Sequence, residues 1–204
     1  MERVIKASRS DKGRIIELLV EAFWNDPHII WFTGNGPKKR KRIATMMSHA
    51  FESALLRGDV YLTADKQSAA IWRNSPKKGF TLRQFWENIR FIAHFGLKKV
   101  KAIGDLDKRL QAGYPSNEPY HYLFIIGTSK EGRGKGLSSL LVNKVLAESD
   151  AKGVSTYLET ANPNNIPIYN GKGFTSYGTL DLRGADPVTI HLMVRNPKKA
   201  GHTT

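Results

Sequence analysis

The fold of this chain is decided by the stretch Arg133-Gly134-Lys135-Gly136-Leu137-Ser138. An apolar, aromatic-rich segment at 120–126 precedes it and is long enough for a strand, and apolar residues recur at helical spacing over 139–146. The sequence therefore predicts a strand, a glycine-rich turn and a helix in succession. Such a turn directs unpaired N–H groups and the positive end of the helix dipole toward one point, which suits a phosphate or pyrophosphate. A glycine-rich turn can also serve structure alone.

The glycine-rich stretch matches neither of two common nucleotide-binding patterns. It lacks the Walker spacing, and Leu137 and Ser139 stand where the dinucleotide pattern requires its third glycine. It resembles the Arg/Gln-x-x-Gly-x-Gly/Ala loop of the GNAT N-acetyltransferase superfamily, although Ser138 replaces the usual Gly or Ala. The resemblance implies that the loop holds the pyrophosphate of acetyl-CoA, through Arg133, Gly134, Lys135, Gly136, Leu137 and Ser138.

A second motif follows about thirty residues later. The segment 157–169 contains Leu-Glu-Thr and Asn-x-Pro-x-Tyr elements and leads to Gly173-Phe174. It resembles the later block of the same superfamily, in its puromycin N-acetyltransferase-like branch. The similarity is firm over about Tyr120 to Arg195 and looser at 21–27. It implies a single-domain α/β fold in which a mixed, mostly antiparallel sheet is splayed between strands four and five and flanked by helices.

The resemblance also assigns roles to single residues. The pantetheine arm of acetyl-CoA is expected along the fourth strand, at Ile126, Gly127 and Thr128, where a bulge frees a backbone N–H for the developing oxyanion. Tyr169 matches the tyrosine that protonates the leaving thiolate; the alternative is a tyrosine packed on the last helix. Asn165, like Asn162, is expected either to bind the pantetheine amides or to cap a helix.

The general base is less closely specified. An alkylammonium has a pKa of ~10.4, so a side chain or a water relay must remove a proton before attack. Glu159, at the end of the fifth strand, is the first choice, unless it is a structural carboxylate. His121 and Tyr122 are weaker candidates on opposite faces of the fourth strand. Five aromatic residues are candidates either for an acceptor pocket or for the core: Phe23, Trp24, Trp31, Trp72 and Trp86.

Periodicity predicts the remaining elements. We expect strands at 2–7, 59–63, 68–72, 174–182 and 188–194. Helices are expected from an N-cap at Ser10 to Phe23 and over 38–56. A helical insert is expected at 81–112, with a shorter basic helix near Asp105, and an acceptor pocket would vary there. The segment Asn25-Asp26-Pro27 is expected to stop the first helix. The acetyltransferase domain should cover 1–197 and a frayed tail 198–204.

Composition limits the possible classes of protein. The 204 residues contain no cysteine, and the six histidines form no pair with metal-ligand spacing, so no metal is expected. No apolar run is long enough to span a membrane, which favours a cytoplasmic protein without a membrane partner. The net charge is +14, and residues 1–119 carry 22 Lys and Arg against 12 Asp and Glu. The run 38–42 indicates either a solvated helix face or a source of attraction for anions, and the sequence does not favour a nucleic-acid partner.

Together these patterns predict an acetyl-CoA-dependent N-acetyltransferase acting on a small-molecule amine, with a homodimer as one option. Two alternatives stay open: a non-catalytic CoA-binding regulatory module, and an enzyme that acetylates protein or associates with the ribosome.

Overall fold

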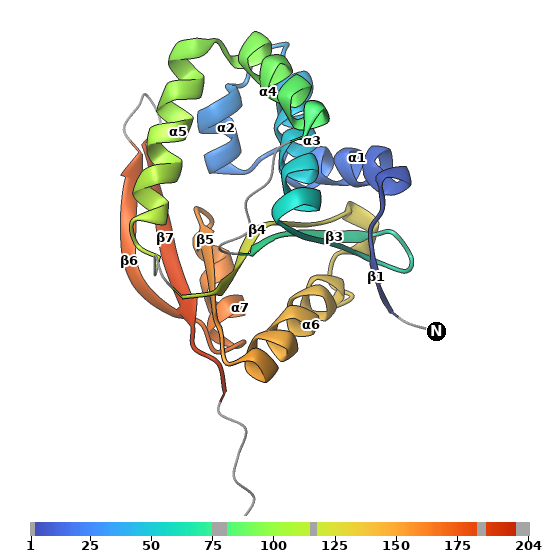
Figure 1. Cartoon of the computed structure of the whole chain (residues 1–204), viewed down its shortest axis with the longest axis vertical. Coiled ribbons are helices and arrows are strands. Elements are labelled where there is room, and N and C mark those ends of the chain that lie inside the picture. Colours follow the sequence, from blue (N-terminus) through green and yellow to red (C-terminus); the bar gives the residue numbers. More distant parts are fainter. Residues whose placement is uncertain (1–2, 75–80, 115–117, 183–186, 199–204) are drawn as a thin grey trace, which may run out of the picture.

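Among the described residues, seven strands form one mixed sheet in the computed structural model of this chain (Figure 1). The structure describes residues 3–74, 81–114, 118–182 and 187–198. All neighbouring strands are antiparallel except β4 and β5, which are parallel. The strand order is β1-β2-β3-β4-β5-β7-β6, with bounds β1 Val4–Lys6, β2 Gly58–Thr63, β3 Ser68–Asn74, β4 Tyr120–Thr128, β5 Ser155–Thr160, β6 Thr175–Leu182 and β7 Val188–Arg195. The predicted fold class is confirmed.

The parallel strands β4 and β5 pair only at their beginnings. The four residues 120–123 lie opposite 155–158, and within the described strands the pairing goes no further. In the pairing of β4 with β3 the register shifts, so that Phe124 is an extra residue between Leu123 and Ile125. A bulge of this kind bends and twists a strand. The second half of β4 therefore diverges from β5 and keeps one open edge, which is the predicted splay.

Helices cover both faces of the sheet. Helices α1 (Lys12–Ala22) and α3 (Lys39–Arg57) pack on one face, and α6 (Leu137–Lys152) packs on the other (Figure 1). Strand β3 contributes to the hydrophobic cores on both faces of the sheet, because successive side chains of a strand point to opposite faces. Its Ile71 joins the α1–α3 core, while Trp72 is fully buried in the α6 core.

The short helix α2 (Pro27–Thr33) was not predicted. The carboxylate of Asp26 accepts a hydrogen bond from the N–H of Ile29 at 3.0 Å, and Pro27 occupies the first turn. Acidic N-caps followed by proline are start signals for a helix. The segment 25–27 thus ends one helix and begins the next, whereas the sequence analysis interpreted it as a stop alone.

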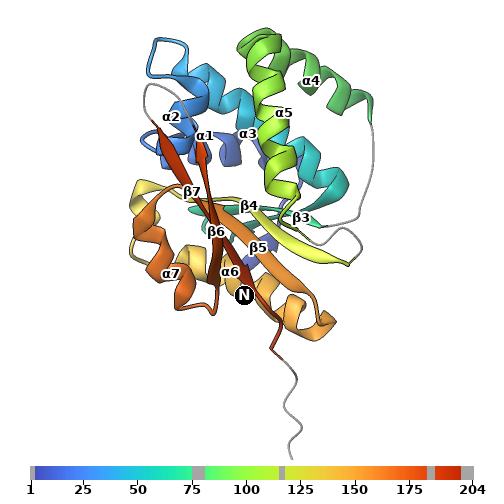
Figure 2. The same cartoon turned by 90° about the vertical axis from the view of Figure 1, so that its left-hand side faces the viewer.

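The predicted helical segment 81–112 forms two helices, α4 (Leu82–Phe95) and α5 (Leu97–Gln111). Gly96 separates them with a φ of +75°, a conformation that favours glycine. Both helices lie on the side of the sheet that α1 and α3 cover, and α5 descends toward the point where β4 and β5 separate (Figure 2). Helices α4 and α5 therefore lie over the region in which β4 and β5 diverge.

The first helix begins at a different residue from the one predicted. The predicted N-cap Ser10 is wrong: Ser8 begins a 3₁₀ turn, 9–11, in which Asp11 accepts a hydrogen bond from the N–H of Ser8 at 3.0 Å. Helix α1 begins only at Lys12, because the hydrogen bond between Ser8 and Asp11 stabilises the preceding 3₁₀ turn.

Farther along the chain, another 3₁₀ turn (Pro163–Asn165) leads to α7 (Ile166–Asn170). Of the predicted tail, residues 199–204 lie outside the described residues.

Candidate active site

A cavity of about 910 Å³ opens where β4 and β5 diverge. Strands β4 and β5 line it on the sheet side, and residues of the α1–α2 junction and of α2, α3, α4 and α5 line the remaining walls. The predicted site residues on its wall are Ile126, Gly127, Thr128, Arg133, Glu159, Asn165 and Tyr169. One cavity thus brings together residues that are predicted to bind a cofactor and residues that are predicted to act in catalysis.

The open edge of β4 forms one wall, with residues 125–128 facing the cavity. A Cβ at Gly127 would lie 2.8 Å from Cδ2 of Leu19 and 2.9 Å from Cβ of Ala22, so only glycine lets α1 approach this closely. An unpaired strand edge presents backbone donors and acceptors that an extended ligand with amide groups can pair with. The pantetheine arm of acetyl-CoA is such a ligand, so this edge fits it.

The loop 133–138 turns into helix α6. Gly134 and Gly136 have φ angles of +76° and +71°, and the space that a Cβ would fill is open at both positions. Gly136 is the N-cap of the 16-residue helix α6, whose first-turn N–H groups have no partners within the helix. The side chains of Arg133 and Lys135 are exposed beside it. This cradle of glycines, N–H groups and two cations fits a pyrophosphate.

A carboxyl group faces the cavity from β5. The hydroxyl of Tyr122 donates a hydrogen bond of 2.5 Å to Oε2 of Glu159, while Oε1 of Glu159 is buried without a hydrogen-bond partner. Burial raises the pKa of Glu159 well above its ordinary value; the charge of Arg73 lowers it and that of Asp107 raises it. Burial likewise keeps the pKa of Tyr122 above its ordinary value, so its hydroxyl stays a donor. Glu159 therefore has one free oxygen with a raised proton affinity.

Charged groups surround this carboxyl. The guanidinium carbon of Arg73 lies 3.5 Å from the ring centroid of Phe124, the residue that the bulge in β4 presents. Its Nη1 is 3.5 Å from Oδ1 of Asp107 on α5. The aromatic contact holds the guanidinium in place. Neither Arg73 nor Asp107 belongs to a local sequence motif, and their contact joins β3 to α5, so no local pattern marked either residue as part of the site.

Away from the strands the cavity is mostly apolar. Its polar groups there include two neutral imidazoles: burial lowers the pKa of His28 to about 4 and also lowers that of His49. Nε2 of His49 lies 2.8 Å from Oδ1 of Asn88, whereas Nε2 of His28 is buried without a partner. The apolar lining residues contributed by the helices include Phe32, Met46, Phe91, Ile92, Val100, Ile103, Leu106 and Leu110.

Asn165 is the last residue of the 3₁₀ turn 163–165, and Tyr169 lies in the helix α7 that follows it. Tyr169 is buried beside Phe174, with ring centroids 5.8 Å apart, and burial raises its pKa to about 12. Its phenol is therefore protonated at neutral pH. Of the two asparagines, Asn162 caps the 3₁₀ turn by accepting from the N–H of Asn164 at 3.1 Å. Asn165 makes no capping bond; its Nδ2 donates to Oγ1 of Thr160 at 3.3 Å and its side chain borders the cavity.

Other candidate residues lie elsewhere. His121 faces α6, where Nδ1 is 2.7 Å from Oγ of Ser149, so it does not line the cavity. Of the five aromatic residues considered for an acceptor pocket only Phe23 lines it. Trp72 is fully buried in the core, whereas Trp24 and Trp86 are exposed.

The basic run 38–42 is only partly a solvated face. Lys39 is buried, with Nζ 2.8 Å from Oδ1 of Asn35 and 4.7 Å from the ring of Trp24. Arg42 donates to the carbonyl of Thr33 at 2.8 Å and so ties α3 to α2. Two of the five cations thus stabilise the fold, which the charge pattern alone did not reveal.

Comparison with known proteins identifies the class. The family model for the acetyltransferase (GNAT) family matches residues 41–174, which is most of this chain. The match includes β4, the loop 133–138 and α7. The chain therefore belongs to the GNAT acetyltransferase family and is an acetyltransferase.

Individual relatives agree with this assignment. An uncharacterised N-acetyltransferase of Schizosaccharomyces pombe is 24% identical over 95% of this chain and 83% of the relative. The crystal structure of a histone acetyltransferase HPA2 and related acetyltransferase from Corynebacterium glutamicum shares the fold, with a TM-score of 0.73, 22% identity, and coverage of 99% and 98%. Arylalkylamine N-acetyltransferase 2 from Aedes aegypti does so too, with a TM-score of 0.65, 13% identity, and coverage of 96% and 99%. Among the described residues no cluster of His, Asp and Glu has the form of a metal site.

Proposed function

We propose that this protein transfers the acetyl group of acetyl-CoA to an amine, with Glu159 as general base and Tyr169 as general acid. The observation that carries the proposal is the free Oε1 of Glu159, buried in the cavity where β4 opens. A buried acceptor atom without a partner is uncommon, and a ligand that donates a proton or a hydrogen bond would satisfy it.

Glu159 and Tyr169 carry out different proton transfers in the proposed reaction. Acetyl-CoA supplies the thioester, held by the loop 133–138 at its pyrophosphate and by the β4 edge at its pantetheine arm, with Asn165 within reach of the same wall. Oε1 of Glu159 takes the proton of the acceptor ammonium, and its raised pKa brings the two groups closer in proton affinity. The amine nitrogen then bonds to the acetyl carbon as the carbon–sulfur bond breaks. The Tyr169 hydroxyl gives its proton to the departing sulfur, and the resulting phenolate takes the second proton, which the nitrogen loses as the amide forms. Glu159 then releases the first proton to solvent.

The acceptor is proposed to be a small molecule that fits within the cavity. Helices α4 and α5 supply part of the wall, and the lining from these helices is mostly apolar. An amine with an apolar body fits this lining, with its nitrogen at Glu159. The puromycin N-acetyltransferase-like resemblance points in the same direction.

An acceptor screen tests the proposal. Purified protein is mixed with acetyl-CoA and one amine at a time, including puromycin, polyamines and peptides with free N-termini, and released thiol is measured. We expect thiol release that depends on a small amine and falls in Glu159→Gln. Binding of acetyl-CoA without thiol release on any acceptor would indicate a non-catalytic module. Acetylation of peptides alone would indicate a protein acceptor.

A further inference from the structure

The first part of the amphipathic helix α4, residues 82–90, presents its two faces in the reverse of the usual order, whereas Phe91 and Ile92 farther along the helix line the cavity. A surface helix normally turns its apolar side toward the core. In α4 the buried positions are Gln84 and Glu87, whereas the large side chains of Leu82, Phe85, Trp86 and Ile89 are 41 to 70% exposed. These four recur at spacings of three and four residues, so they form one continuous row on the outer face.

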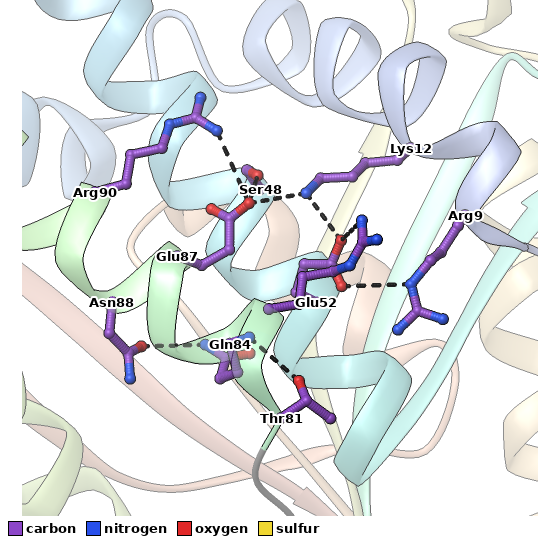
Figure 3. A network of polar contacts seen from close by, with 10 residues as sticks. Arg9, Lys12, Ser48, Glu52, Thr81, Gln84, Glu87, Asn88 and Arg90 are labelled. Atoms are coloured by element: carbon purple, nitrogen blue, oxygen red, sulfur yellow. Dashed lines mark hydrogen bonds and ion pairs between the residues drawn. The ribbon is translucent and has the colours of Figure 1, made fainter.

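The inner, polar face of α4 is held by a buried network (Figure 3). Nζ of Lys12 lies 2.9 Å from Oε1 of Glu52 on α3 and 2.9 Å from Oε1 of Glu87 on α4. The hydroxyl of Ser48 donates to the same oxygen of Glu87 at 2.9 Å. Burial by itself would raise the pKa of Glu87, but the hydrogen bonds from Lys12 and Ser48 outweigh it and keep that pKa below its ordinary value. The network fixes the helix orientation, so the outward apolar row is a built feature of the fold.

The apolar row is bordered on one side by positive charge. Arg83 and Arg90, with side chains 59% and 50% exposed, approach Glu52 and Glu87 only to 3.9 and 3.8 Å. With Arg9 and Lys12, four cations surround these two carboxylates and leave a surplus of positive charge. A groove of about 550 Å³ runs along this border, lined by Leu82, Trp86, Glu87 and the two arginines.

From this arrangement we infer that the outer face of α4 docks onto the anionic surface of a phospholipid bilayer. Leu82, Phe85, Trp86 and Ile89 would enter the boundary between headgroups and acyl chains, and Arg83 and Arg90 would lie at the level of the lipid phosphates. Tryptophan and arginine suit that boundary because each combines an apolar part with a polar end. No described helix is long and apolar enough to cross a membrane. The absence of a membrane partner was expected only because the sequence has no membrane-spanning segment. That criterion does not detect a helix that lies on the membrane surface.

A second copy of the chain fits this face less well. If two copies paired their rows with the helices antiparallel, Arg83 of one copy would lie beside Arg90 of the other, and like charges would repel. A lipid surface needs only a few inserted side chains and supplies the opposite charge.

Co-sedimentation of the full chain with vesicles tests this inference. We expect binding to vesicles of phosphatidylcholine with phosphatidylglycerol at low salt and weak binding to phosphatidylcholine alone. Trp86→Gln should weaken binding roughly tenfold or more, because it removes the largest inserted side chain. Arg83→Gln and Arg90→Gln should each weaken it about fivefold, with a loss that shrinks as salt is added.

Matched control variants distinguish vesicle binding by the α4 face from nonspecific hydrophobic or electrostatic binding. Ile168→Gln removes a 56% exposed side chain on α7, and Lys108→Gln removes an 82% exposed cation on α5; both should bind vesicles like the wild type. Trp86→Phe should keep most of the binding but lose the part of the fluorescence blue shift that Trp86 contributes, and circular dichroism checks folding of each variant. Equal loss in the controls, or no binding to anionic vesicles, would overturn the inference. Concentration-dependent dimerisation that Trp86→Gln removes, without lipid binding, would assign the face to a second copy instead.

Discussion

Glu159→Gln is expected to change activity and stability in opposite directions. Glutamine keeps the size of the side chain and an oxygen that can accept the Tyr122 hydrogen bond, but it cannot take a proton from the acceptor ammonium. Loss of a general base lowers turnover by roughly 10²–10⁴-fold. Because the binding of acetyl-CoA does not use this carboxylate in the proposed mechanism, its affinity should be unchanged.

The stability change follows from the raised pKa. A carboxyl with a higher pKa in the folded than in the unfolded protein binds more protons when folded, so stability falls as pH rises from the unfolded pKa through the folded one. The neutral glutamine side chain avoids the free-energy cost of burying the ionised carboxylate. The variant should therefore melt at a higher temperature than the wild type at pH 8, and the difference should shrink toward pH 4.

Two measurements check this reasoning. Thermal unfolding is followed at both pH values, and the pH dependence of kcat/KM is measured with an acceptor found in the screen. Wild-type activity should rise with pH through the raised pKa of Glu159, and the variant should lack this rise. Glu148→Gln, the same change in a carboxylate paired with Lys144 on α6, should alter neither property. Turnover of Glu159→Gln within about twofold of wild type, against the expected general-base loss, or a lower melting temperature at pH 8, would refute the account of this residue.

Two further predictions follow. Tyr169→Phe should lower turnover roughly 10²–10⁴-fold without changing the Kd for acetyl-CoA, because it removes only the proton donor; stopped-flow thiol release with calorimetry measures both, and near-normal turnover would exclude the role. Lys12→Met should cost about 1.5–3 kcal/mol, because it removes the charged hydrogen-bond donor that the Glu52 and Glu87 side chains, 2% and 9% exposed, share. Lys6→Met, which removes a 66% exposed side chain from its ion pair with Asp59, should cost less than about 1 kcal/mol; equal losses of melting temperature would contradict the role of the network. The Lys12→Met effect should diminish as pH falls and Glu87, whose pKa is lowered, becomes protonated.

Local patterns predicted most of the fold correctly. The strands, the hairpin over 58–74 and the helix at 39–57 follow hydrophobic periods that a single segment contains. The splay between β4 and β5 came from the family resemblance, since two strands separated by a helix share no local signal. Helix α2 was missed although Asp26 and Pro27 carried its start signal, because they were interpreted only as the end of α1.

Candidate site residues could be named from the sequence only where they belong to contiguous motifs. Arg133, Glu159 and Tyr169 come from the two motifs and lie on the wall of one cavity, and their roles stay predictions. Arg73 and Asp107 are 34 positions apart and meet only in the folded chain, so nothing in their surrounding sequences marked them. Trp86 shows the opposite case: it was a candidate for an acceptor pocket or for the core, yet the anchoring of Glu87 by Lys12 leaves Trp86 exposed on the outer side of α4.

Calorimetric titration of acetyl-CoA into Gly136→Asp tests the central claim most directly. Asp at this N-cap would place bulk and a negative charge where the pyrophosphate must lie, and it would also strain a φ of +71°. Gly153→Asp is the matched control, because Gly153 has a φ of +66° at the opposite end of the same helix, and space is open around both glycines. Acetyl-CoA should bind the wild type and Gly153→Asp, whereas Gly136→Asp, folded by circular dichroism, should show no measurable binding. Equal acetyl-CoA affinity in both variants would contradict the assignment of the loop 133–138 to the cofactor.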